Sequence, residues 1–258
     1  MKLKFLGTGG GRFVTGLQRR RTAGIILESD ETQIHIDPGP GALVYSHREV
    51  DSEKTEAVLI SHAHPDHSND AEPMIEMMTQ AYSKPGAVFA NETCFEGSPD
   101  IEKRISDYHQ GLCVKKEVLE PGNRILFKGL EIKTQFMKHG DPNTAGFRIS
   151  SGEKTIGFWT DSEYDKSLVD FYSDCDTLVV YCTRPRGKQI KGHTAIDDVP
   201  KITEKLDLST VIITHFGYAL LDSDLEEQQE WLSENTDCKV VFAEDNMEFP
   251  GNRSLGDF

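Results

Sequence analysis

Apolar residues along this chain either alternate with polar ones or run together in short blocks, and both patterns predict β-strands. The first strand alternates over 2–6 (KLKFL), whereas 57–60 (AVLI) and 210–214 (TVIIT) are the continuous blocks typical of strands buried on both faces. The strands predicted in this way cover 2–6, 23–28, 32–36, 57–60, 87–90, 113–118, 124–127, 130–137, 145–150, 154–159, 177–181, 210–214 and 239–242.

Helical periodicity predicts helices between and after these strands, at 42–49, 71–82, 99–109, 195–205 and 223–234. Asn69 or Asp70 can cap the second of these helices. Many strands come first along the chain, and a strand–helix alternation that ends in a strand follows. This order predicts the α/β fold class, with two packed sheets and helices outside them in a four-layer αββα sandwich. We expect one domain that spans 1–258.

Residue types that bind metal ions stand where predicted strands end. The block AVLI is followed by SHAHPDH, and three further apolar strands are each followed by one such residue. The seven candidates are His62, His64, Asp66, His67, His139, Asp161 and His215. Strand ends that meet at one edge of a sandwich would bring them together. Imidazole nitrogens and carboxylates at these spacings predict a dinuclear metal site with one shared carboxylate.

The local spacing within HAHPDH supports this hypothesis. His62 and His64 lie two residues apart, so both can turn toward one ion from an extended loop. Asp66 and His67 are adjacent and project differently, which suits a second ion, and Pro65 stiffens the loop. A lone histidine at a strand end is more often a hydrogen-bonded surface residue. Three histidines and an aspartate within six residues do not fit that alternative.

Charge and cysteine usage narrow the choice of partners. The net charge of −15 disfavours broad non-specific binding of nucleic acid, although a cationic pocket could still accept a small anion. The five cysteines are scattered, without a C-x-x-C pair, which argues against both a disulfide framework and a thiolate zinc cluster. No apolar stretch approaches the roughly 20 residues of a membrane span, and no signal peptide is recognisable. We therefore expect a cytoplasmic protein without membrane contact.

His193, in KGHTAIDDVPKI, adds a candidate proton donor. It precedes a predicted helix that Thr194 could cap, and its imidazole would then lie near the strand that ends at His215. A positioned imidazolium can protonate the departing alkoxide of a phosphodiester near neutral pH. The alternative is a surface residue at the start of a helix.

Basic residues gather in two loops despite the acidic total. They are Arg12, Arg19, Arg20 and Arg21 after the glycine-rich loop 7–11, and Arg184, Arg186, Lys188 and Lys191 before His193. Guanidinium groups match phosphate oxygens, so Arg20, Arg21, Arg184 and Arg186 are candidates for binding substrate. The backbone N–H groups of 7–11 could complete an anion nest. Charge balance on a solvated surface is the other interpretation.

The motif H-x-H-x-D-H, a later isolated histidine, a T-D turn after a strand and a final T-H after a strand resemble the metallo-β-lactamase superfamily. The similarity runs from FLGTGG to VIITHF and implies the αββα sandwich. It implies two divalent cations, with zinc as the first candidate and manganese or iron as alternatives. One site would use His62, His64 and His139, and the other Asp66, His67 and His215, with Asp161 bridging and Asp37 orienting ligands rather than binding metal.

The H-T-A-x-D run before VIITHF is similar to the histidine motif of the ribonuclease Z and cyclic phosphodiesterase branch. The tRNA-processing enzymes of that branch carry a long arm where this chain has only 21 residues, 140–160, and a glutamate where it has Cys182. A cysteine followed by a basic loop and the histidine resembles the phosphoribosyl cyclic phosphate phosphodiesterase. The cysteine-bound structural zinc of that enzyme has no counterpart in this sequence.

We therefore expect a metal-dependent hydrolase of small or cyclic phosphodiesters, of nucleotide or ribose phosphate type, with His193 and Asp66 as catalytic residues. In the expected reaction a hydroxide held by the two cations attacks phosphorus, and His193 protonates the leaving oxygen. The alternatives are a ribonuclease Z-type nuclease that acts on short RNA without the tRNA-gripping arm, a thioester or lactone hydrolase, and an inactive binding paralogue. The one argument for a homodimer is the analogy with related phosphodiesterases, which are often dimers.

Overall fold

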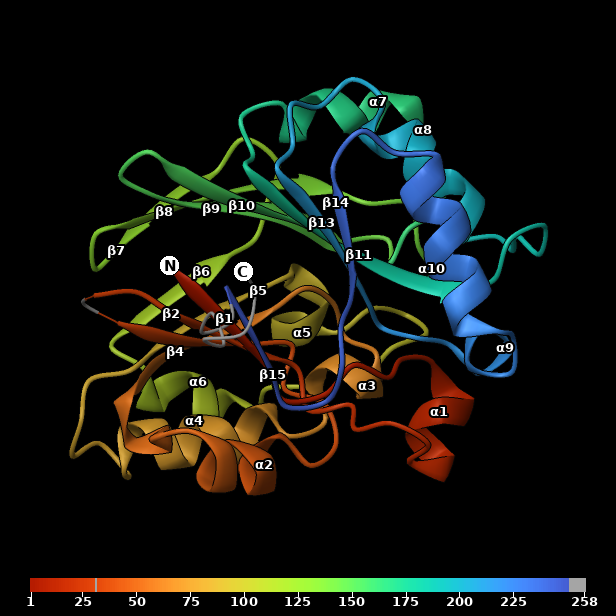
Figure 1. Ribbon diagram of the computed structural model, residues 1–258. Coiled ribbons are helices and arrows are strands. Elements are labelled where there is room, and N and C mark those ends of the chain that lie inside the picture. Colours follow the sequence, from red (N-terminus) through yellow and green to blue (C-terminus); the bar gives the residue numbers. More distant parts are fainter. Residues whose placement is uncertain (31, 251–258) are drawn as a thin grey trace.

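Two β-sheets pack face to face at the centre of the computed structural model, which describes residues 1–30 and 32–250 (Figure 1). The first sheet contains β1 (Lys2–Phe5), β2 (Ile25–Glu28), β3 (Gln33–Ile36), β4 (Thr55–Ile60), β5 (Ala87–Ala90), β6 (Lys115–Val118) and β15 (Met247–Phe249). Its strand order is β15-β1-β2-β3-β4-β5-β6. The pairs β3–β4, β4–β5 and β5–β6 are parallel, so the loops after β4 and β5 leave the same edge of the sheet.

The second sheet contains β7 (Arg124–Phe127), β8 (Leu130–Phe136), β9 (Ala145–Ser151), β10 (Lys154–Trp159), β11 (Thr177–Arg184), β13 (Thr210–Thr214) and β14 (Lys239–Phe242). Its strand order is β14-β13-β11-β10-β9-β8-β7, and the short β12 (Thr194–Ala195) pairs with β11 off this path. The strands β10, β11 and β13 are parallel to one another, so the loops that follow them also leave one common edge.

Helices cover the outer faces of both sheets. Figure 1 shows α2, α4 and α6 beyond the first sheet, and α7, α8 and α10 beyond the second. The helices are α1 (Arg12–Leu17), α2 (Ala42–Glu49), α3 (Pro65–Ser68), α4 (Ala71–Thr79), α5 (Glu92–Glu96), α6 (Asp107–Leu112), α7 (Lys166–Val169), α8 (Val199–Thr203), α9 (Tyr218–Leu221) and α10 (Leu225–Glu234), with 3-10 turns at Ser52–Lys54, Asp170–Tyr172 and Ile196–Asp198. The predicted αββα sandwich is confirmed. Among the described residues, no helix combines the length and the apolar character needed to cross a membrane.

The strand β4 shows why its sequence is a continuous apolar block. Leu59 faces the core between the two sheets, whereas Val58 and Ile60 face the core under α4. The strand β13 repeats this arrangement, because Ile212 points between the sheets and Ile213 points to the helices on the other side. Burial of one such side chain contributes about 1.5–3 kcal/mol. Both strands are therefore held firmly, and the residues that follow them start from fixed positions.

Two of the predicted helices were wrong in part. The segment 99–109 is helical only from Asp107, because the side chain of Ser106 accepts the N–H of His109 and caps the helix there. The segment 195–205 begins as strand β12 and a 3-10 turn before α8. Thr194 does not cap a helix, since its hydroxyl donates to the carbonyl of Ser162 and accepts from the indole of Trp159. The short helices α1 and α3 were not predicted, since each is too short to show a period.

Candidate metal centre

Four strand ends deliver the seven side chains predicted to bind metal. His62 follows β4 of the first sheet, while His139, Asp161 and His215 follow β8, β10 and β13 of the second sheet. The structure brings all seven together in overlapping groups whose nitrogen and oxygen atoms lie within 4.8 Å of one another. The convergence predicted from the sequence is therefore present, and the binding of metal by these residues stays a prediction.

One group consists of three imidazoles. The Nε2 atom of His62 lies 3.0 Å from Nδ1 of His64, and Nε2 of His139 lies 3.0 Å from the same Nδ1 atom. His62 is fully buried and the side chain of His139 is only 3% exposed, whereas His64 is partly exposed. Through His64 this group is open to solvent on one side, as a site that admits a substrate must be.

The second group combines two imidazoles and a carboxylate. The Nε2 atoms of His215 and His67 are 2.9 Å apart, and Oδ2 of Asp66 lies 3.2 Å from the first and 3.5 Å from the second. This group is more enclosed than the first, because His67 and His215 are both buried.

Asp161 lies between the two groups. Its Oδ2 atom is 3.6 Å from Nε2 of His139 on one side and 3.5 Å from Nε2 of His67 on the other. The same oxygen is 3.9 Å from Nε2 of His62. A carboxylate that faces both groups is the arrangement expected of a bridging residue.

Hydrogen bonds behind the centre determine which ring nitrogens carry a proton. Oδ2 of Asp37 lies 3.0 Å from Nδ1 of His67 and accepts the hydroxyls of Ser61 and Tyr181, each at 2.9 Å. Since Ser61 donates its only proton to Asp37, its oxygen accepts from Nδ1 of His62 at 3.0 Å. In the same way Nδ1 of His139 donates to the carbonyl of Gly192 at 2.7 Å. The Nδ1 atoms of His62, His67 and His139 thus all have a hydrogen-bond partner behind the centre, and each ring turns its Nε2 toward the centre, as a metal-binding imidazole would. Despite its burial, the carboxylates of Asp66 and Asp37 raise the pKa of His67 well above its usual value.

The donor set shows that divalent cations fit the residues present. Imidazole nitrogens and carboxylate oxygens face one another here at 3.2–3.9 Å, and a cation between them would bind both. Oδ1 of Asp161 and Nδ1 of His215 are buried 3.2 Å apart, and neither atom has a hydrogen bond within the described residues. Nitrogen and oxygen donors of this kind suit zinc, manganese or iron.

The ionisation of these groups follows from burial and from their neighbours. Burial, together with the imidazoles of His67 and His139, lowers the pKa of His62 well below its usual value. Burial opposes ionisation of Asp161, but the imidazoles of His215, His67 and His139 outweigh it and hold the pKa of that carboxyl well below its usual range. The centre is therefore electrostatically coupled, and its charges depend on one another.

His215 is held in a left-handed conformation, with φ at 61°, and its ring lies against Gly10. A Cβ atom at position 10 would lie 2.2 Å from Nδ1 of His215, so a side chain there would have to displace the ring. Glycine is required at position 10 because the His215 ring lies too close to the backbone there to leave room for a side chain. The predicted role of the glycine-rich loop as an anion nest was wrong, because the N–H groups of Gly9, Gly10 and Gly11 donate to Arg21, Phe216 and Asp66 within the protein.

We therefore expect Gly10→Ala to weaken metal binding by the group that contains His215. A loss of affinity of about 10–100-fold, typical when a supporting residue of a metal site is changed, should appear in a chelator competition with zinc. Gly16→Ala is the matched control, because nothing lies within 4 Å of a Cβ atom at that position. Unaltered zinc affinity in Gly10→Ala would show that the loop adapts and that the contact is unimportant.

His193 lies at the rim of the centre. Its ring centroid is 4.9 Å from that of His139, and its Nδ1 atom is 3.9 Å from Oδ2 of Asp161. Burial lowers the pKa of His193, which the carboxylate of Asp161 partly offsets. Its Nδ1 atom is buried without a hydrogen-bond partner in the described part of the chain. The structure thus places His193 beside His139 and Asp161, and its predicted position near the strand that ends at His215 stays a prediction.

The four arginines predicted to bind substrate contact the protein itself. Arg20 donates to the hydroxyl of Thr8 and the carbonyl of Ala243, and Arg21 pairs with Glu49. Arg186 pairs with Glu227 at 3.0 Å and lies over the ring of Trp231. Arg184 donates from Nε to the carbonyl of Lys188, inside the loop that leads to His193. These contacts are all within the protein, and substrate binding by the four arginines stays a prediction.

Sequence reasoning did not identify several residues that support the centre. Ser61 and Tyr181 complete the network of Asp37, and Asp141 contacts the HAHPDH loop at the N–H of Ala63. Their signals were weak: Ser61 directly precedes His62, and Asp141 follows His139 by two residues. Tyr181 stands in an apolar strand and could not be distinguished from a core residue.

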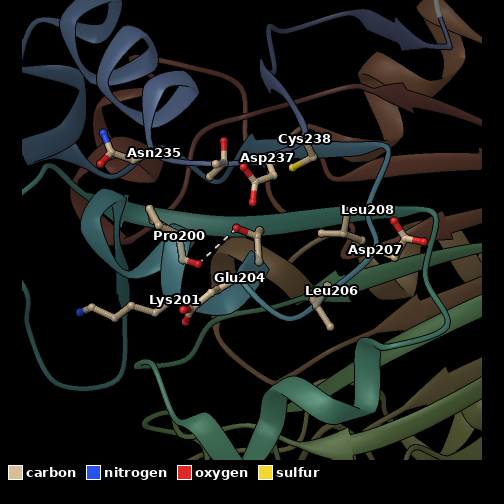
Figure 2. Close-up of a pocket in the computed structure, with 11 residues that line it drawn as sticks. Pro200, Lys201, Glu204, Leu206, Asp207, Leu208, Asn235, Asp237 and Cys238 are labelled. Carbon is tan, nitrogen blue, oxygen red and sulfur yellow. Dashed lines mark hydrogen bonds between the residues drawn. The ribbon is translucent and has the colours of Figure 1, made fainter.

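A separate concavity lies between α8 and the segment after α10, where Figure 2 shows its side chains. Its volume is about 370 Å³, and its lining includes Lys201, Glu204, Asp237 and Cys238. Burial raises the pKa of the Cys238 thiol, so this cysteine is not an activated nucleophile. The concavity shares no residue with the groups at the strand ends.

Two sheets whose strand ends gather imidazoles and carboxylates around a solvent-facing centre define the metallo-hydrolase class of protein. The family model for the beta-lactamase superfamily domain matches residues 32–216, and the chain belongs to that superfamily. The predicted resemblance to the metallo-β-lactamase superfamily is thus confirmed, and the chain is a metallo-hydrolase of that superfamily.

Two relatives match by sequence over most of their length. The uncharacterized protein MJ1374 of Methanocaldococcus jannaschii is 34% identical over 247 residues, which cover 93% of this chain and 91% of that protein. The probable metallo-hydrolase YhfI of Bacillus subtilis is 25% identical over 213 residues, which cover 80% of this chain and 84% of that protein.

Solved structures share the fold. The crystal structure of YhfI matches with a TM-score of 0.79 and 19% identity, over 96% of this chain and 98% of that one. The structure of a diphosphatase from the PhnP family matches with a TM-score of 0.70 and 19% identity, over 97% and 98% of the two chains.

Proposed function

We propose that this metallo-hydrolase cleaves small or cyclic phosphodiesters of the nucleotide or ribose phosphate type, with two divalent cations and His193 as the proton donor. The observation that carries the proposal is the position of His193. Its unpaired Nδ1 atom is 3.9 Å from Oδ2 of Asp161, and its ring packs edge-on to His139. The leaving alkoxide of a phosphodiester needs a proton, and this group stands where it can supply one.

The seven clustered side chains would hold the cations. His62, His64 and His139 form one set, Asp66, His67 and His215 form the other, and Asp161 faces both. Bound divalent cations supply Lewis acidity and lower the pKa of water toward neutrality. The network around Asp37 keeps the imidazoles of His62 and His67 in the tautomer that such cations require.

The residues of the chain would then act on the substrate directly. The partial exposure of His64 and His193 leaves the rim open to an anionic group, whereas the Asp37 side of the centre is closed by protein. His193 would protonate the leaving oxygen from this rim. Among the basic residues, Arg184 is a candidate to contact a phosphate, because it pairs with Ala195 of β12, the short strand that directly follows His193.

A panel of substrates tests the proposal. Protein loaded with zinc or manganese should hydrolyse bis-p-nitrophenyl phosphate and a subset of linear and cyclic phosphodiesters, and treatment with a chelator should remove this activity. A thioester and a lactone are tested beside them with the same protein. Faster turnover of the thioester or lactone than of every phosphodiester would contradict the proposal, as would cleavage confined to short RNA.

A further inference from the structure

Asp141 is a buried carboxylate outside the clustered groups at the strand ends. It is fully buried and follows His139 by two residues. No lysine, arginine or histidine in the described part of the chain forms an ion pair with it. A buried charge without a counter-ion costs several kcal/mol unless hydrogen bonds compensate for it. Its presence beside a metal centre therefore requires a physical reason.

Four hydrogen bonds hold this carboxylate from three segments. Its Oδ2 atom accepts the backbone N–H of Ala63 at 3.0 Å and the side-chain amide of Asn91 at 2.8 Å. Its Oδ1 atom accepts the hydroxyl of Thr93 at 2.8 Å and the backbone N–H of Asn143 at 3.1 Å. Each oxygen thus accepts two hydrogen bonds, which fixes the position of the carboxylate.

The contact with Ala63 places Asp141 between predicted metal ligands. Ala63 is buried and separates His62 from His64. Its carbonyl accepts from Nε of Arg104 at 2.7 Å, so charged side chains hold both the N–H and the C=O of this residue. The backbone on either side of Ala63 can then turn only slightly, and the two imidazoles keep their relative direction.

The same carboxylate is tied to the third imidazole of the group. Only Gly140 separates Asp141 from His139, and glycine by itself would leave the intervening backbone free to rotate. The bonds from Ala63 and Asn91, which follow strands of the first sheet, anchor this loop of the second sheet. One side chain therefore sets the position of His139 relative to His62 and His64.

We propose that Asp141 is a positioning residue that fixes the spacing of the His62, His64 and His139 nitrogens and so sets the cation affinity of that group. This inference rests on the metal binding assumed in the proposed function and not on the substrate. Its test measures metal affinity, so the result does not depend on whether the proposed substrate is correct.

The variant Asp141→Asn tests the proposal. An amide accepts with one end only, so in either orientation the donors on one side, Ala63 with Asn91 or Thr93 with Asn143, lose their acceptor while the volume is kept. The link between the Ala63 backbone and the loop that carries His139 is therefore weakened. Zinc binding to metal-free protein is measured by competition with a chromophoric chelator. We expect the dissociation constant of one of the two zinc ions to rise by about 10–100-fold, with the other unchanged. His139→Ala, which removes one imidazole of the group, identifies the zinc ion that is affected.

Two further variants separate positioning from general stability. Arg104→Met releases the other side of Ala63 and should weaken the same zinc ion, whether or not Asp141→Asn folds. Asp176→Asn is the matched control, because that carboxylate also accepts a backbone N–H, from Thr155 at 2.7 Å, at the opposite end of β10 from Asp161. It should leave both zinc ions unchanged.

The thermal midpoint of the metal-free protein is recorded for each variant. A folded Asp141→Asn protein that binds both zinc ions as the parent does would overturn the proposal. An equal weakening of both ions, together with a lowered midpoint of the metal-free protein, would also overturn it, because this is the result of a purely structural role. Unaltered zinc affinity in Arg104→Met would count against the claim that the hydrogen bonds of Asp141 and Arg104 to Ala63 hold the neighbouring imidazoles in place.

Discussion

Asp161→Asn is expected to reduce the hydrolysis of bis-p-nitrophenyl phosphate by roughly 10³-fold or more. The Oδ2 atom of Asp161 lies 3.5–3.9 Å from the Nε2 atoms of His67, His139 and His62, so it faces both groups of predicted ligands. Its carboxylate also offsets part of the positive charge that two cations bring. An amide has no net charge and a poor affinity for divalent cations, so the two groups lose their shared donor.

Metal content distinguishes this explanation from simple unfolding. Elemental analysis of Asp161→Asn should give fewer than two metal ions per chain, whereas the far-ultraviolet circular dichroism should be unchanged. Asp174→Asn is the matched control, since its carboxylate is 71% exposed and pairs with Arg148 at the surface of the second sheet. Full metal content and full activity in Asp161→Asn would rule out a bridging role for this residue.

His193→Ala is expected to leave metal content intact and to lower turnover by an amount that depends on the leaving group. A positioned general acid contributes about 10²–10⁴-fold, and this loss should appear with phosphodiesters that release an alkoxide. The loss should be much smaller with bis-p-nitrophenyl phosphate, because nitrophenolate departs without protonation. The comparison of the two substrates within one variant is therefore the decisive measurement.

The control for His193→Ala is His47→Ala, which removes an exposed imidazole on α2, in contact with Ser52 and outside the clustered groups. It should not alter either rate. Equal losses on both kinds of substrate in His193→Ala would contradict the role of general acid. A loss of metal in that variant would instead make His193 a ligand together with His139 and Asp161, with which it forms one of the clustered groups.

The sequence allowed the αββα sandwich and the convergence at its edge to be predicted for a physical reason. Strands such as β4 and β13 are buried on both faces, so they appear as continuous apolar blocks, and a metal-binding residue type follows each of them directly. The positions of His62 and His215 therefore followed from local pattern alone. The helix expected at 99–109 was wrong because the cap at Ser106, rather than periodicity, decides where that helix begins.

The residues that hydrogen-bond to the predicted metal ligands could not be predicted in the same way. The proton positions on His62 and His67 depend on Asp37, Ser61 and Tyr181, which come from different strands. Arg20 and Arg21 were expected to meet substrate from their position in a basic loop. The structure instead gives them partners such as Ala243 and Glu49, which are distant in the sequence. Contacts of this kind form between segments that are far apart in the sequence, so no local pattern predicts them.

Because the residues of HAHPDH leave the first sheet while His139, Asp161 and His215 leave the second, any ion held among them would join two separately hydrogen-bonded halves of the molecule. Such an ion would act as a non-covalent cross-link, and its binding energy would add to the energy that keeps the halves together. The same ion would then be needed both for catalysis and for holding the two sheets together. A chain that could not bring these strand ends together would lose the activity and this contribution to stability.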